Sequence, residues 1–110
     1  MNKQDESFKD FIVDQLSEMD SVEARRMFGG HGLYQDETFF GFVHKGKLFF
    51  KINETTIGAY RKRKMKPFRP NGKQTLKTYY QVPVEIIEDA DELREWAVRA
   101  VECQGNNCKA

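Results

Sequence analysis

The sequence predicts an α+β domain in which helices pack on one face of a mostly antiparallel sheet. Three observations lead to this prediction. Apolar residues recur at helical spacing near both ends of the chain. The interior consists of short alternating runs that are separated by turn residues. Finally, 39% of the 110 residues are hydrophobic and nine are Phe, which is enough for one packed core.

The two terminal segments are the expected helices. Residues 5–19 have charged residues on one side and an apolar stripe on the other, which comprises Phe8, Phe11, Ile12, Leu16 and Met19. The last helix is expected to begin at Asp89, which forms a capping pair with Glu92, and to end near Gly105. Its stripe comprises Leu93, Trp96, Ala97, Ala100 and Val101. Both stripes are expected to cover the sheet.

Three strands are expected in the first half. Residues 22–34 are predicted to form one long strand with a bulge or kink at Gly29-Gly30, and a tight hairpin at these glycines is the alternative. A second strand, residues 38–44, alternates so that Phe40, Phe42 and His44 share one face and Phe39, Gly41 and Val43 share the other. Lys45-Gly46 has the length of a hairpin turn and leads into a third strand, residues 47–52, with Leu48, Phe50 and Ile52 inward.

The second half is expected to contain two more strands. Asn53 or Thr55 can cap a short helix that continues to about Lys64. Phe68-Arg69 form a brief strand before the turn at residues 70–72. Residues 75–82 form the next strand, and residues 83–88 form one helical turn before the last helix. The predicted sheet therefore has four or five strands.

The chain is expected to be a single domain over residues 1–110, with a core of about 5–103 and a loose tail at 104–110. It has no apolar run of 18 residues, and its first residues are polar, so no membrane partner and a cytoplasmic location are expected. Two cysteines near the end and two distant histidines do not make a metal site. No metal and no cofactor are therefore predicted.

The glycine-rich stretch around His31 is the first candidate site. Gly29, Gly30 and Gly32 require either a sharp bend or the close approach of another group to the backbone. A phosphate loop is disfavoured because another strand, rather than a helix, follows the glycines. His31 has no evident nucleophile beside it, so we expect no enzyme and assign no catalytic residue. A small enzyme or an anion-binding protein that uses Gly29–Gly32 and His31 is kept as an alternative.

The charges are segregated, and this segregation gives the second candidate site. Residues 55–84 carry eight cations and no acid, whereas residues 1–20 and 85–95 carry six acids each. Cations neutralise phosphates and aromatic rings stack on bases, so the block predicts a nucleic-acid surface. The candidates are Arg61, Arg63, Lys66, Arg69, Lys73, Lys77 and Tyr79. Internal pairing with the acidic helices is the competing explanation.

Arg26-Met27-Phe28-Gly29-Gly30-His31-Gly32-Leu33-Tyr34 strongly resembles the opening motif of the TfoX N-terminal domain family. Further similarities are Phe39–Phe42, Leu48–Lys51, Pro67-Phe68, Tyr79–Pro83 and the apolar stripe of the last helix, and together they cover residues 8–103. The resemblance implies a secretion-chaperone-like fold, in the order helix, three strands, helix, two strands, helix. It also implies relatives that regulate DNA-uptake competence and act with the transcription machinery.

The function expected first is that of a non-enzymatic regulatory module that binds a protein partner, which the resemblance suggests is part of the transcription machinery. The candidate surface is the edge formed by Arg25, Arg26, Gly29, Gly30, His31 and Gly32. Nucleic-acid binding by residues 61–77 is the second hypothesis. The chain is expected to be a monomer or a homodimer.

Overall fold

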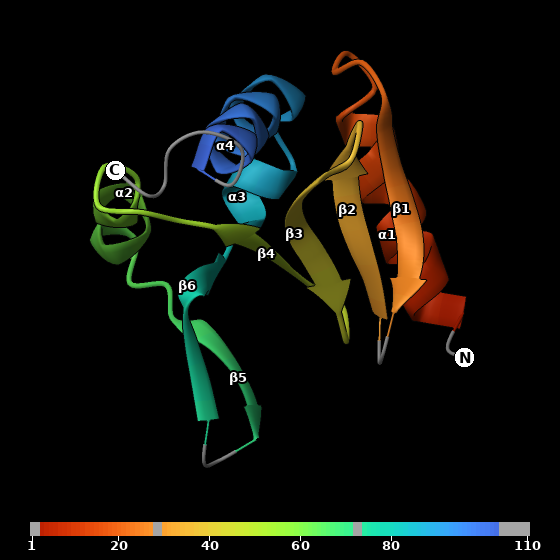
Figure 1. Ribbon diagram of the computed structural model, residues 1–110. Coiled ribbons are helices and arrows are strands. Elements are labelled where there is room, and N and C mark those ends of the chain that lie inside the picture. The colour runs from red at the N-terminus through yellow and green to blue at the C-terminus, as the bar shows by residue number, and fades with distance from the viewer. Residues whose placement is uncertain (1–2, 28–29, 72–73, 104–110) are drawn as a thin grey trace.

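Six strands and four helices make up the protein, as a computed structural model of residues 3–27, 30–71 and 74–103 describes (Figure 1). In chain order they are α1 (Lys3–Gln15), β1 (Val22–Met27), β2 (Gly30–Gln35), β3 (Thr38–His44), β4 (Lys47–Lys51), α2 (Ile57–Lys62), β5 (Pro67–Asn71), β6 (Gln74–Gln81), α3 (Val84–Ile87) and α4 (Ala90–Glu102). All strand pairs are antiparallel, in the order β1-β2-β3-β4-β6-β5. The predicted α+β class is confirmed.

The prediction of one long strand over residues 22–34 is wrong. β1 and β2 are two antiparallel strands in which Met27 lies opposite Gly30 and Val22 lies opposite Gln35. Four strands therefore precede α2, rather than three, and the sheet has six strands. The alternative prediction of a hairpin is correct, because the chain reverses direction between Met27 and Gly30. β2 consequently lies between β1 and β3, where its apolar residues can be buried.

A β-bulge in β3 corrects the predicted alternation of that strand. Leu33 lies opposite Gly41 and Tyr34 lies opposite Phe39, so Phe40 is an extra residue in β3. Phe40 and Val43 consequently belong to the core beneath the helices. Phe39 and Phe42 stack on each other, with ring centroids 6.4 Å apart, on the other face of the sheet. We call this second face, away from α1 and α4, the open face.

The main core lies between the sheet and the helices α1 and α4. Ile12 and Leu16 from the first helical segment, and Leu93 and Ala97 from α4, are fully buried against Phe40, Leu48 and Phe50 of the sheet. The inward positions predicted for residues 47–52 are therefore confirmed. One predicted core residue, Phe11, is 43% exposed because it borders a surface hollow that is also lined by Leu48 and Val84.

Tyr60 joins α2 to the end of this core. Its ring centroid lies 4.7 Å from that of Trp96 and 6.0 Å from that of Tyr80. The side chain is 3% exposed, and this burial raises the pKa of the Tyr60 phenol, because its anionic form would lose hydration. A single tyrosine thus fixes α2 against both α4 and β6.

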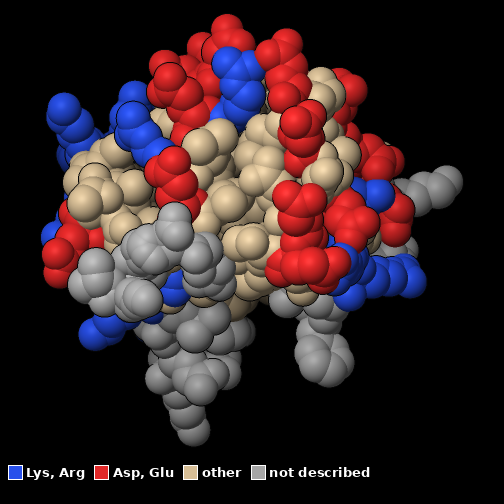
Figure 2. All heavy atoms as spheres, turned by 45° about the horizontal axis from the view of Figure 1, so that its top comes forward, with Lys and Arg blue, Asp and Glu red and all other residues tan. Residues whose placement is uncertain are grey.

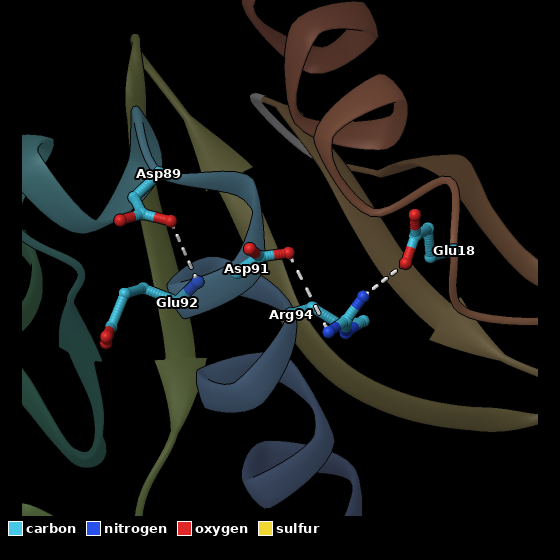
Figure 3. A network of polar contacts seen from close by, with 5 residues as sticks. All are labelled: Glu18, Asp89, Asp91, Glu92 and Arg94. Carbon is cyan, nitrogen blue, oxygen red and sulfur yellow. Dashed lines mark hydrogen bonds and ion pairs between the residues drawn. The ribbon is translucent and has the colours of Figure 1, made fainter.

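Polar contacts position α4 (Figure 3). The Asp89 carboxylate accepts a hydrogen bond from the backbone N–H of Glu92 at 3.2 Å, which confirms the predicted N-cap. Arg94 donates to Glu18, which follows α1, and lies 3.8 Å from Asp91 on its own helix. Arg94 therefore links α4 to the segment between α1 and β1.

Gly30 is expected to tolerate no side chain. A Cβ atom there would lie 1.9 Å from the carbonyl oxygen of Val43, which is backbone of the neighbouring strand. Gly30→Ala should therefore lower the free energy of unfolding by about 3 kcal/mol, as overpacked substitutions do. Gly58→Ala is the control, since a Cβ in α2 meets nothing within 4 Å and should raise stability by about 1 kcal/mol. Urea unfolding measures both, and equal stability of Gly30→Ala and the wild type would contradict the packing described.

The cap of α4 gives a second prediction. Asp89→Ala removes the acceptor for the Glu92 N–H and should cost about 1 kcal/mol of stability. Asp89→Asn keeps an acceptor of nearly equal capping strength without the charge, so it should retain most of that stability. Thermal unfolding of the two variants separates the capping hydrogen bond from the charge. Equal losses in both would show that the carboxylate charge, rather than the cap, stabilises the helix.

Candidate functional site

A cluster of aromatic rings covers the open face of the sheet. The Phe42 ring lies 5.0 Å from Phe49 and 4.9 Å from Phe68, and Tyr79 lies 5.4 Å from Phe42. Phe39 extends the cluster toward Tyr34, at 5.3 Å. Phe42 and Phe49 are nearly buried, but Tyr34, Phe39, Phe68 and Tyr79 are only half-buried. The open face thus has its own apolar cluster with rings accessible at its margin.

Two cations lie over rings of this cluster. The Arg25 guanidinium carbon is 4.3 Å from the centroid of Tyr34, and the Lys51 ammonium is 5.3 Å from the centroid of Tyr79. Both are within the range of a cation–π interaction. The two cations come from β1 and β4, so their positive charges lie over two separate parts of the open face.

A basic hollow of about 310 Å³ adjoins the aromatic cluster. Its described lining residues come from the β3–β4 turn and its flanks, from β5 and the residue before it, and from the end of β6: His44, Lys45, Lys47, Phe49, Lys66, Pro67, Phe68, Arg69 and Gln81. Four of them are cations, and no Asp or Glu is among them. We call this feature the basic hollow. It can accept an anion beside an aromatic surface.

The backbone of the β3–β4 turn is strained at one wall of the basic hollow. Lys45 has φ +49° and Gly46 has φ +75°, so both residues are left-handed. The predicted two-residue turn is confirmed, and this conformation favours Asn or Asp, rather than Lys, at its first position. Lysine at position 45 therefore lowers the stability of the turn. Its side chain places an exposed ammonium group beside the hollow.

The described part of the glycine-rich stretch is strand. Gly30 and Gly32 are buried, and Gly30 packs against the backbone of β3. His31 is 4% exposed, and its Nε2 lies 3.8 Å from a carboxylate oxygen of Glu6 on α1. Its Nδ1 has no hydrogen-bond partner among the described residues. Gly29 lies outside the described residues.

Arg25 and Arg26 are both exposed on β1, and their surroundings differ. Arg25 donates to Glu23 at 2.7 Å and lies 3.6 Å from Glu37. The hydrogen bond to Glu23 raises the pKa of Arg25. Arg26 lies opposite His31, and it makes no ion pair within the described part of the chain. Arg26 is the cation of this pair that is available to a partner.

The basic block does not converge on one surface. Arg63 lies 3.3 Å from the Glu85 carboxylate and 5.5 Å from the Trp96 ring, on the side of the helices. Arg61 is exposed on α2, whereas Tyr79 is in the aromatic cluster and Lys77 is exposed nearby in β6. Of the predicted candidates that the structure describes, only Lys66 and Arg69 line the basic hollow. Lys73 is outside the described residues.

Acidic side chains gather on the helical side of the molecule. Figure 2 shows many Asp and Glu side chains on the side of the molecule that lies at the top of Figure 1, with Lys and Arg fewer and mostly toward the edges of this view. Glu85, Glu88, Asp91, Glu92 and Glu95 are all exposed there. The charge segregation along the chain is therefore partly a segregation between the two sides of the sheet.

Sequence reasoning missed Lys45 and Lys47 as members of a site. They lie outside the basic block along the chain, and only the pairing of β4 with β6 brings them near Lys66. The available signal was Lys at the first position of a two-residue turn, where Asn or Asp would be the usual choice.

No three His, Cys, Asp or Glu side chains in ranges 3–27, 30–71 and 74–103 come together as a metal site. Within those same ranges, no helix combines the length and apolar character that crossing a membrane requires.

Comparison with protein families matches residues 14–104 to the TfoX N-terminal domain. A search of curated proteins found no match. The matched range contains every strand of the sheet, the aromatic cluster and the basic hollow. Since it covers most of the 110 residues, the chain belongs to the TfoX N-terminal domain family.

Proposed function

We propose that the protein is a non-enzymatic cytosolic regulatory module that binds a protein partner along strand β1. The observation that carries this proposal is the place of β1 at one end of the sheet, where it pairs with β2 alone among the described strands (Figure 1). An edge strand offers backbone N–H and C=O groups to which an extended segment of another protein can add.

The side chains of β1 support an acidic partner segment. Val22 and Ala24 pack against the core on the helical side, so alternation puts Arg26 on that side and Arg25 on the open face. An added strand would therefore meet one exposed arginine on each face. Arg26, which has no ion pair among the described residues, can form a new one at little internal cost.

Two further features support a regulatory module over an enzyme. His31 is buried beneath α1, where substrate has little access to its ring. Membership of the TfoX N-terminal domain family supports a regulatory role, and a component of the transcription machinery is the partner we propose.

Arg26→Glu tests the proposed surface. It puts a like charge against an acidic partner strand, so partner recovery by affinity capture should fall at least tenfold, as for a cost of about 1.4 kcal/mol or more. Arg61→Glu is the control, since it makes the same change in charge on an exposed position of α2. Quantitative mass spectrometry measures the recovered protein, and isothermal titration calorimetry then gives its affinity.

Two results would count against strand addition at β1. Full recovery of the partner by Arg26→Glu would remove β1 as the surface. A loss of the same size in Arg61→Glu would show that net charge alone governs capture. Sedimentation velocity of the wild type identifies the special case in which a second copy of the chain occupies the edge.

A further inference from the structure

We propose that the basic hollow binds the backbone of single-stranded nucleic acid, with a base placed against the aromatic cluster. Four cations line the hollow, and no acid is among its described lining residues. Among the described residues, no carboxylate forms an ion pair with Lys45, Lys47 or Lys66. The positive charge of these three lysines is therefore not neutralised within the described part of the protein, and it is available to phosphates.

The aromatic wall distinguishes this hollow from a simple cationic patch. The half-buried Phe68 ring is held edge-on by Phe42 at 4.9 Å and by Phe49 at 4.9 Å, and His44 lies 5.2 Å from it. A ring fixed in this way loses little freedom when a base stacks on it. The amide of Gln81 adds a donor and an acceptor for a base edge. An acidic peptide would use the lysines but would gain little from the rings.

The open face provides a continuation for further nucleotides. The aromatic cluster extends from the hollow through Tyr79 and Phe39 to Tyr34. Lys51 lies over Tyr79, and Arg25 lies over Tyr34. Half-buried rings alternating with cations are the arrangement that binds single strands with little sequence preference. Base-paired strands keep their bases stacked inside the duplex and cannot use these rings.

The left-handed backbone at Lys45 is consistent with a binding role. Asn would suit φ +49° better, so the lysine lowers local stability in exchange for an ammonium group at the hollow. Lys45→Asn should therefore raise the melting temperature by about 4 °C while it weakens binding of the strand. Opposite changes in stability and affinity would not arise from a merely structural lysine.

Fluorescence anisotropy with a labelled 12-nucleotide single strand of mixed sequence, as DNA and as RNA, tests the proposal on the full chain. At 50 mM salt, the double variant Lys45→Asn with Lys47→Gln should bind at least tenfold more weakly than the wild type. The slope of log affinity against log salt should fall by about 1.4 for two lost phosphate contacts. The matched control, Arg61→Gln with Lys62→Gln, removes the same charge from α2 and should change affinity less than twofold.

Phe68 supplies the second test. Phe68→Leu should weaken binding about tenfold through lost stacking, and Phe68→Tyr should restore most of it because a ring remains. Melting curves confirm that each variant is folded at the assay temperature. The two Phe68 variants differ in the ring but not in charge, so they report on base contact separately from phosphate contact.

Several outcomes would overturn the proposal. No binding by the wild type at 50 mM salt would remove it. Equal weakening in the α2 control would assign the binding to net charge, and equal affinity for a 12-residue polyglutamate would assign the hollow to acidic proteins. Equal affinity for a 12-base-pair duplex would exclude single-strand recognition. No described lining residue of the hollow comes from β1, so this site and the protein-partner edge can each fail alone.

Discussion

The β-bulge at Phe40 is the constraint on which both faces of the sheet depend. Because there is one extra residue between Phe39 and Gly41, the side chains of β3 after the bulge lie on the opposite faces from those that strict alternation would give. Phe40 and Val43 can therefore fill the core under α1 and α4, while Phe39 and Phe42 join the rings of the open face. Without the bulge, one of the two clusters would lose its central aromatic residues. The packing of the main core and the aromatic cluster of the candidate site consequently both depend on this bulge.

The two faces of the sheet also carry different charges. Exposed carboxylates occupy the surface of α3 and α4, whereas the cations Lys45, Lys47, Lys66 and Arg69 surround a hollow beside the open face. A near-zero net charge thus hides an electrostatic polarity across the molecule. Such a polarity orients an approaching anionic partner toward the cationic side. It also explains why Arg63 and Arg94, which lie on the helical side, pair with acids.

The edge at β1 and the basic hollow offer contacts of different kinds. β1 offers backbone hydrogen bonds flanked by Arg25 and Arg26, which suits an extended protein segment. The hollow offers ammonium groups beside Phe68, which suits phosphates and bases. No described lining residue of the hollow belongs to β1 or β2, so both surfaces can be occupied together. A module that joins a protein partner to a nucleic acid would need this separation.

Local signals in the sequence determined much of the fold. The apolar stripes of both terminal helices, the Asp89 cap and the Lys45-Gly46 turn depend on neighbouring residues, and the α+β class follows from them. Local residues left one long strand and a hairpin open at residues 22–34, and they did not indicate the bulge at Phe40, because a register is chosen by what the partner strand buries. The basic hollow could not be predicted from the sequence either, since its lysines are brought together only by pairing between distant strands. The sequence therefore showed which types of residue could form a site, and only the tertiary structure decided which of these residues lie together.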